Sequence, residues 1–366
     1  MTVTNPELSP EDDLRLNVLL AQNPEAVRID EGKLVVYALT GKGEARVDLN
    51  PNCAEETYLR RVKAMLSSHV MGSPGGYPVF LERWTRMGQI RDTSLEQLLL
   101  LGESEAIVAV AHAPGLTESI ARRAWWALPD AANARQMLNN REVANSEIGR
   151  ELAAFLLEFL PFEEQPGNML ESVRLVLQPG LIDAAERDRL WQRAQTRRNM
   201  LVGFLHTVPN DLPLTGAAHP LLREYSRVFE GAPSGQAPVL TALARVFSAP
   251  GQAFLQTCEL ALARVSDQEV TVSLFDAIAN YFHETRFTDT GYRDIDELEH
   301  AVSELECKYG AELEPYLRSI WFLSAISVAL LDPIFARTDA IGSGMRRKIK
   351  PVTDRIFHHL RVLSGA

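Results

Sequence analysis

Residues 26–49, AVRIDEGKLVVYALTGKGEARVDL, decide how the fold begins. Short runs of β-branched and apolar residues alternate here with Asp30-Glu31-Gly32 and Gly41-Lys42-Gly43, which have the composition of turns. The pattern predicts three antiparallel strands connected as a small meander. The rest of the sequence has no other convincing β-pattern, so we expect a mainly α-helical protein.

Helices are predicted on both sides of the meander. Residues 9–20 open with Ser-Pro-Glu, which supplies an N-cap, a proline at the first helical position and an acidic first turn. After the meander, Asn52 and Glu55 have the spacing of a capping box. We therefore expect a second helix that begins at Asn52 and runs to about Val70.

From Ser94 onward the sequence predicts one helix after another, interrupted by proline and glycine. Ser94 and Gln97 form another capping pattern at the start of this region. The string ALPDAANARQML at 127–138 echoes FLPFEEQPGNML at 159–170, with an offset of 32 residues. Offsets of this size are typical of α-solenoids. The helical array is therefore expected to be either a HEAT-like α-solenoid over about 91–205 or an irregular bundle.

Composition shifts predict three regions. Residues 1–90 form an N-terminal α+β region with the meander, 91–215 a helical repeat-like domain, and 216–366 a C-terminal helical domain. The boundary near residue 215 is indicated by segments rich in proline, glycine and alanine at 207–220 and 230–238.

The overall composition is that of a soluble globular protein. The chain has 366 residues, of which 46% are hydrophobic and 23% charged, and its net charge is −11. This acidity disfavours nucleic acid as a partner, because phosphates are bound by Lys and Arg. The longest apolar run, 320–331, has 12 residues, whereas a bilayer span needs about 20. We expect this run to be a buried core helix and the protein to be cytoplasmic, without a membrane span.

The loop at 72–78 is a candidate anion site. Gly75 and Gly76 permit a close approach of the backbone to a ligand, and Arg83 and Arg86 follow nearby. The alternative is a tight turn that only packs the chain. No lysine follows the glycines as it does in a phosphate-binding P-loop.

Cys53 is a candidate sulfur-carrying thiol because it lies at the predicted start of a helix, where the helix dipole favours a thiolate. Glu55 and Glu56 oppose this effect with negative charge. The three cysteines, Cys53, Cys258 and Cys307, have no close spacing, so neither a disulfide framework nor a zinc ribbon is expected.

Trp125 and Trp126 are candidate interface residues. Neighbouring side chains on a helix diverge by about 100°, so one indole can fill the core while the other lines a groove or an interface. Aromatic residues are common at the centres of protein interfaces. The alternative is that both belong to the core.

The C-terminal third contains two blocks of opposite charge. Residues 289–314 are acidic and residues 337–361 are basic. They either face each other or solvent, or they form a partner-binding surface in which Arg346, Arg347 and Lys348 take part.

No complete catalytic pattern is found in the sequence. The nearest approach to a GxSxG elbow is Gly342-Ser343-Gly344, which lacks the required spacing. Glu297 and His300 make a single ExxH pair, whereas a carboxylate-bridged di-metal bundle needs two. We therefore expect no enzymatic activity, no metal and no cofactor.

Several strings taken together resemble the DsrS family, a group of sulfur reduction proteins associated with the reverse dissimilatory sulfite reductase system of sulfur-oxidising bacteria. They are LSPEDDLRLNVLLA at 8–21, HVMGSPGGYPVFLERWTRMGQ at 69–89, SLEQLLLLGE at 94–103, RRAWWALPDAANARQML at 122–138 and SVRLVLQPGLI at 172–182. The resemblance covers mostly residues 8–215. It implies a cytoplasmic accessory protein of sulfur oxidation and carries over no catalytic residue, cofactor or metal.

Three functions remain open at this stage. The first is a non-catalytic accessory or regulatory protein of bacterial sulfur oxidation that binds protein partners of that machinery. The second is a sulfur-handling protein that carries a persulfide on Cys53. The third is an RNA-level regulator that uses the basic tail at 346–361.

Overall fold

A computed structural model of the chain describes residues 8–72, 92–225, 238–288, 291–307 and 309–365. The chain divides into two compact units, residues 1–158 (unit 1) and 159–366 (unit 2), and each is described by itself. The division into three regions that the sequence suggests stays a prediction.

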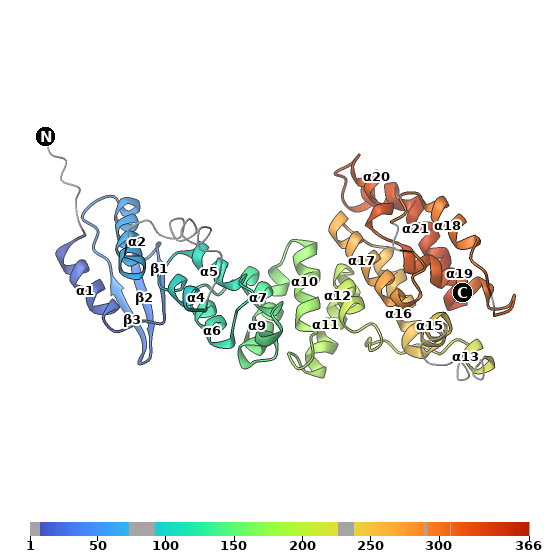
Figure 1. Ribbon diagram of the computed structural model, residues 1–366, viewed down its shortest axis with the longest axis horizontal. Helices are drawn as coiled ribbons and strands as arrows, with labels where there is room; N and C mark the ends of the chain where they lie inside the picture. The colour runs from blue at the N-terminus through green and yellow to red at the C-terminus, as the bar shows by residue number, and fades with distance from the viewer. Residues whose placement is uncertain (1–7, 73–91, 226–237, 289–290, 308, 366) are drawn as a thin grey trace. The chain divides into compact units, whose positions relative to one another are not determined.

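Unit 1 begins with a helix and a three-stranded sheet and continues with helices (Figure 1). Its described elements are α1 (Pro10–Leu20), β1 (Ala26–Asp30), β2 (Val35–Thr40), β3 (Gly43–Asp48), α2 (Glu55–Met71), α4 (Asp92–Leu98), α5 (Ser104–Ala111), α6 (Glu118–Ala127), α7 (Ala131–Leu138), α8 (Arg141–Ala144) and α9 (Glu147–Phe159).

The predicted meander is confirmed. The strands are antiparallel in the order β1-β2-β3, and one row across the sheet aligns Arg28, Tyr37 and Arg46. Successive side chains of a strand point to opposite faces. The apolar neighbours of this row, such as Val27 and Val36, therefore point to the other face, where they are buried.

Helices α1 and α2 bury the apolar face of the sheet. Leucines of α1 and the apolar side of α2 join the inward residues of the strands in one core cluster, which contains Leu16, Leu19, Leu20, Val27, Val36, Ala38, Val47, Leu49, Tyr58, Leu59, Val62 and Leu66. Burial of this apolar surface supplies the main driving force for folding of the region.

A buried polar network fixes the position of α1 within this core. The Asp12 carboxylate accepts hydrogen bonds from the Tyr58 hydroxyl at 2.5 Å and from the Asn50 backbone N–H at 2.7 Å. Burial alone raises the pKa of Asp12, but these hydrogen bonds outweigh it and leave the pKa below its usual value. The network joins α1, the residues after β3, and α2.

Glycine is required where the chain returns to the sheet at residue 102. Gly102 has a φ of +69° and forms a parallel bridge with Arg28 of β1. A Cβ at this position would lie 3.0 Å from Cγ1 of Ile29. The left-handed conformation and the close packing therefore both favour glycine.

Two predicted helix starts are wrong. The helix after the meander does not begin at Asn52: its N-cap is Ala54, which makes no side-chain capping bond, and its first residue is Glu55. Helix α4 begins at Asp92, so Ser94 lies inside it and is not its cap. The cap at Ser9, by contrast, is confirmed, because its side chain accepts a hydrogen bond from the Asp12 N–H.

Unit 2 is helical in every element described (Figure 1). These are the 3₁₀ helix η1 (Leu160–Phe162), α10 (Pro166–Val176), α11 (Ala184–Thr196), α12 (Asn199–Thr207), α13 (Leu221–Glu224), α15 (Pro238–Phe247), α16 (Ala249–Leu262), α17 (Gln268–Tyr281), η2 (His283–Thr285), α18 (Ile295–Ser303), α19 (Glu314–Ala325), η3 (Val328–Leu330), α20 (Asp332–Phe335) and α21 (Gly342–Ser364).

The core of unit 2 is built around α12, α16 and α17, which contact one another. Helix α21 packs against α15, α16 and α19. Its inward positions are Met345, Ile349, Val352, Ile356, Leu360 and Leu363, all of them buried. They recur at the helical spacing of three or four residues, so one face of α21 lies in the core while the other is left at the surface.

The structure confirms a mainly α fold that opens with a small antiparallel meander. The echo between 127–138 and 159–170 does not mark equivalent positions, because Met137 lies in the last turn of α7 and Met169 near the start of α10. The apolar run 320–331 is buried for the most part, but its helix ends at Ala325.

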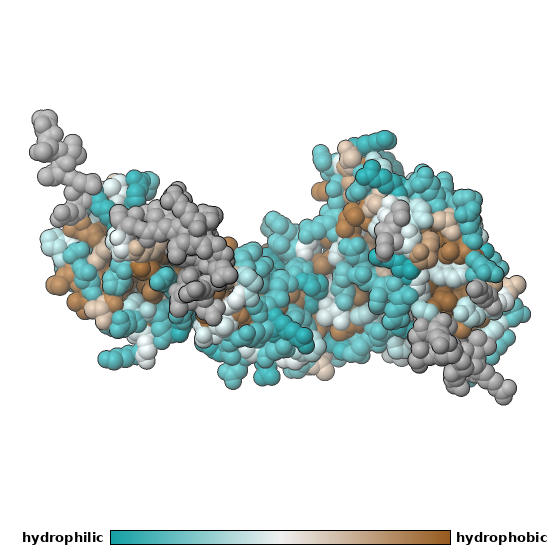
Figure 2. All heavy atoms as spheres, in the orientation of Figure 1, coloured by the Kyte–Doolittle hydropathy of each residue, from teal (hydrophilic) through white to brown (hydrophobic). Residues whose placement is uncertain are grey.

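The face of each unit seen in Figure 2 is largely polar. Figure 2 shows hydrophilic residues over most of the visible face of each unit, with apolar residues in small groups. Among the exposed apolar side chains are Leu14 and Val18 of α1, which are 65% and 55% exposed. No helix among the described residues is both long enough and apolar enough to cross a membrane.

The Asp12 network gives a testable prediction for unit 1. Tyr58→Phe keeps the buried ring but removes one hydrogen-bond donor from a buried carboxylate. We expect it to lower the free energy of unfolding by about 1–3 kcal/mol. Hydrogen–deuterium exchange of peptides from residues 10–71 measures the effect. Tyr37→Phe, which removes a hydroxyl outside the network, is the matched control. Equal protection in both variants would contradict the assigned role.

Candidate functional site

The predicted anion site cannot be placed. Gly75, Gly76, Arg83 and Arg86 lie outside the described residues, so this site stays a prediction.

Cys53 lies in the turn before α2 and is half-buried. The Arg61 guanidinium donates a hydrogen bond from Nη1 to the cysteine Sγ at 3.3 Å. Sequence reasoning missed this neighbour, although Arg61 comes two turns after the cysteine. The Cys53 sulfur therefore has a cationic neighbour in addition to the acidic residues Glu55 and Glu56.

The two tryptophans have different environments. Trp125 is 7% exposed and meets Phe155 edge-to-face, with ring centroids 4.8 Å apart. Its indole N–H donates to the Glu151 carboxylate at 2.9 Å. Trp125 is therefore part of the packed interior of unit 1.

Trp126 is half-buried and belongs to the Arg28 cluster, which consists of Arg28, Tyr37, Glu44 and Trp126. The Arg28 guanidinium lies 4.5 Å from the Tyr37 ring centroid and 4.9 Å from that of Trp126. Glu44 accepts from the Trp126 indole N–H at 3.0 Å and pairs with Arg28 at 3.1 Å. These contacts attach α6 to the outer face of the sheet.

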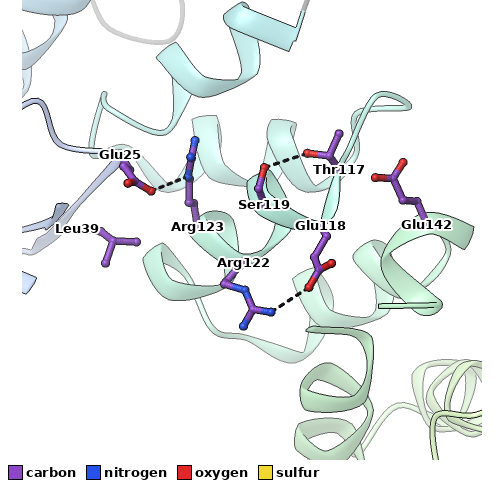
Figure 3. Close-up of a pocket in the computed structure, with 8 residues that line it drawn as sticks. All are labelled: Glu25, Leu39, Thr117, Glu118, Ser119, Arg122, Arg123 and Glu142. Carbon is purple, nitrogen blue, oxygen red and sulfur yellow. Dashed lines mark hydrogen bonds and ion pairs between the residues drawn. The ribbon is translucent and has the colours of Figure 1, made fainter. Parts of the chain in front are cut away.

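A pocket of about 450 Å³ opens in unit 1 between the sheet and α6 and α8 (Figure 3). It is lined by Glu25, Leu39, Thr117, Glu118, Ser119, Arg122, Arg123 and Glu142. Figure 3 shows Arg123 directed to Glu25 and Arg122 to Glu118, and each pair is 3.0 Å apart. Arg123 is also 3.0 Å from Glu96. Because carboxylates already neutralise both arginines, the pocket is poorly suited to binding an anion.

Another concave site among the described residues is a groove of about 280 Å³ in unit 2, between α16 and α21. We call it the α21 groove. It is lined by Leu262, Ala263, Arg346, Arg347, Ile349, Lys350, Thr353, Asp354 and Phe357. Leu262 and Ile349 are 2% and 1% exposed, so they form its floor. The charged side chains stand at its rim, where three cations outnumber the single carboxylate of Asp354.

The rim contains two of the three basic residues that the sequence suggested. Arg346 donates from Nη1 to the Val265 carbonyl at 2.9 Å, which holds its side chain across the end of α16. Arg347 is exposed, and no carboxylate of the described residues forms an ion pair with it. Lys348 does not line the groove and instead donates to the Thr338 hydroxyl.

The two charged blocks face each other only in part. Arg355 of α21 lies 3.5 Å from Asp296 and 3.4 Å from Glu299, both of which belong to α18. Lys350 pairs with Asp354 of its own helix. The basic residues at the start of α21 therefore remain as a separate cationic surface beside the α21 groove.

A serine and a histidine meet in unit 2, but they do not form a nucleophilic pair. The His206 Nε2 atom is 2.8 Å from the carbonyl oxygen of Ser273 and 2.9 Å from its hydroxyl. A carbonyl only accepts, so Nε2 must carry the proton and cannot remove one from the Ser273 hydroxyl. Burial lowers the pKa of His206, which keeps the ring neutral.

The described residues contain no group of three or more His, Cys, Asp or Glu side chains placed to hold a metal ion. Comparison of the chain with protein-family models, with curated proteins and with solved structures finds no match. The resemblance to the DsrS family therefore stays a prediction, and the α21 groove is the feature from which a function is argued below.

His359 gives a prediction of pH dependence. Its ring stacks on Phe322 with centroids 3.9 Å apart, and burial lowers its pKa to about 3. The unfolded chain takes up this proton below about pH 6.5, whereas the folded chain does not. Stability from this residue is therefore full above pH 6.5 and is lost as the pH falls toward 3.

We expect His359 to lower the free energy of unfolding of unit 2 by about 2 kcal/mol between pH 7.5 and pH 5. His359→Phe keeps the stacking and should make this fall smaller by that amount in urea denaturation. The exposed neighbour gives the matched control, His358→Gln, which should keep the pH dependence. An unchanged slope in His359→Phe would contradict the assignment.

Proposed function

We propose that this protein is a non-catalytic accessory or regulatory protein of bacterial sulfur oxidation, and that it acts in the cytoplasm by binding protein partners. The α21 groove is the observation that carries the binding role. Its apolar floor and cationic rim have the make-up of a surface that receives side chains of another protein, with a hydrophobic centre and a polar edge. The resemblance of several strings to the DsrS family is what suggests a link to sulfur oxidation.

Two polar clusters of the described residues support a role without catalysis. In the pocket of unit 1, each arginine is paired with a carboxylate, and in unit 2 His206 is held as a donor. Groups paired in this way stabilise a fold, whereas a general acid or base needs a free position that faces its substrate.

Co-purification tests this function. The tagged full-length protein is isolated under native conditions from cells that grow on reduced sulfur, and bound proteins are identified by mass spectrometry. We expect enrichment of sulfite-reductase or sulfur-transfer proteins over the same tag on an unrelated acidic protein. A bait without partners would contradict the binding role. Turnover of sulfide, sulfite or polysulfide by the pure protein would contradict the absence of catalysis.

A sulfur-carrying thiol is the second candidate, and the contact between Arg61 and Cys53 favours it. In this function the Cys53 thiolate attacks a sulfane sulfur of a polysulfide. A new S–S bond forms at the cysteine, one S–S bond of the polysulfide breaks, and the shortened polysulfide leaves with the electron pair. The guanidinium of Arg61 stabilises the negative charge on the sulfur before and after this transfer.

Intact mass and peptide mapping after exposure to polysulfide test the second candidate. We expect a gain of about 32 Da, one sulfur atom, on the peptide that contains Cys53. Arg61→Met should reduce this gain, and Cys53→Ser should abolish it. Cys307, which is also half-buried, serves as the internal control. Equal sulfur loading of Cys307 and Cys53 would contradict a specific carrier role.

A further inference from the structure

The start of α21 holds positive charge that carboxylates of the described residues neutralise only in part. From Arg346 to Arg361 the chain contains six Lys and Arg residues and a single Asp, although the whole protein has a net charge of −11. Two of these cations have ion-pair partners, since Arg355 pairs with α18 and Lys350 with Asp354. Among the described residues, Arg346 donates to the Val265 carbonyl, and Arg347 forms no ion pair with a carboxylate.

Within α21, Asp354 is the one acidic residue, and it offsets a single cation through its pair with Lys350. The first turn of α21 contains no acidic residue, and its N-cap Ile341 makes no side-chain capping bond. The cations at the rim are therefore best explained by a partner that brings negative charge.

The volume of the groove and its apolar floor limit the chemical class of that partner. A volume of about 280 Å³ is below the range of about 300–1,000 Å³ that is usual for sites of small molecules and cofactors. It suits one large side chain that enters between Leu262 and Phe357. A partner with acidic residues on either side of an apolar one satisfies both the floor and the rim.

We propose that the α21 groove binds an acidic peptide segment of a partner protein, with one apolar side chain of that segment inserted as an anchor. This inference rests on the proposed function as a partner-binding protein and adds the chemical class of the partner. The carboxylates of the segment pair with Arg346 and Arg347, beside the Lys350–Asp354 ion pair, and the anchor covers Leu262, Ile349 and Phe357.

The observations favour a peptide over RNA or a membrane surface. Phe357 is the one aromatic ring among the lining residues, and the Arg361 guanidinium lies 5.6 Å from its centroid. Single-stranded RNA is usually held by several aromatic platforms within a continuous basic channel. Helices that lie on membranes expose their apolar face, whereas that of α21 is packed in the core.

Selection from a display library of random peptides of about 12 residues on the full-length protein tests this inference. We expect the selected sequences to be rich in Asp and Glu and to share one Leu, Ile, Met or Phe. The double variant Arg347→Glu/Lys350→Glu reverses two rim charges and should weaken binding of a synthetic consensus peptide by about tenfold or more. Affinity for wild type should also fall as salt is raised.

The matched control is Arg337→Glu/Lys348→Glu, which changes the net charge equally at exposed positions outside the groove lining. It should bind like wild type in fluorescence anisotropy. Selection of neutral or basic sequences, no selection at all, or equal loss in both double variants would overturn the inference. So would rim-dependent binding of polyuridine RNA or of anionic vesicles in place of the peptide.

The same variants separate this inference from the proposed function. If the co-purified sulfur-oxidation proteins remain bound to Arg347→Glu/Lys350→Glu, the partner-binding function stands and the groove is excluded as its site. If neither variant nor wild type retains a partner, the function itself fails.

Discussion

The packed face of α21 is the constraint on which unit 2 and its groove depend. Met345, Ile349, Val352, Ile356 and Leu360 are buried against neighbouring helices, and together they fix the rotation of the helix about its own axis. With the rotation fixed, the intervening basic residues are forced to the surface and beside α16. A change to a buried position of α21 would therefore also disturb the groove rim, so the surface and the core are not independent here.

In unit 1, polar contacts cover the outer face of the sheet. The sheet has an apolar face covered by α1 and α2, but its outer face carries Arg28, whose guanidinium is held between two aromatic rings and a carboxylate. Such a cluster covers a half-exposed face without a second apolar core, because the arginine stem and the rings bury surface while the charge stays paired. Trp126 therefore contributes to the packing of unit 1 itself.

The features that the sequence predicts correctly are those that depend on interactions between residues close in the chain. The meander and the Ser9 cap depend on residues close in sequence, and both are confirmed. The cap expected at Asn52 is replaced by Ala54. The chain just before Asn52 is bound by Asp12 of α1 through Asn50, a tertiary contact that a short capping pattern does not report. The sequence shows the basic rim of the α21 groove as a block of charge. It does not show the floor of the groove, because Leu262 and Phe357 meet only after α16 and α21 pack together.

The small size of the α21 groove limits how long a partner bound there alone would stay bound. A site that takes one anchor and a few carboxylates buries less surface than the roughly 1,200–2,000 Å² of stable complexes, so contacts through it alone are transient. Charge pairs at an open rim speed encounter more than they slow dissociation. Fast exchange of this kind suits an accessory role, in which the partner must be released to continue its own reaction. A tight and permanent complex would instead require a second contact surface on the chain, which raises the effective concentration of the first.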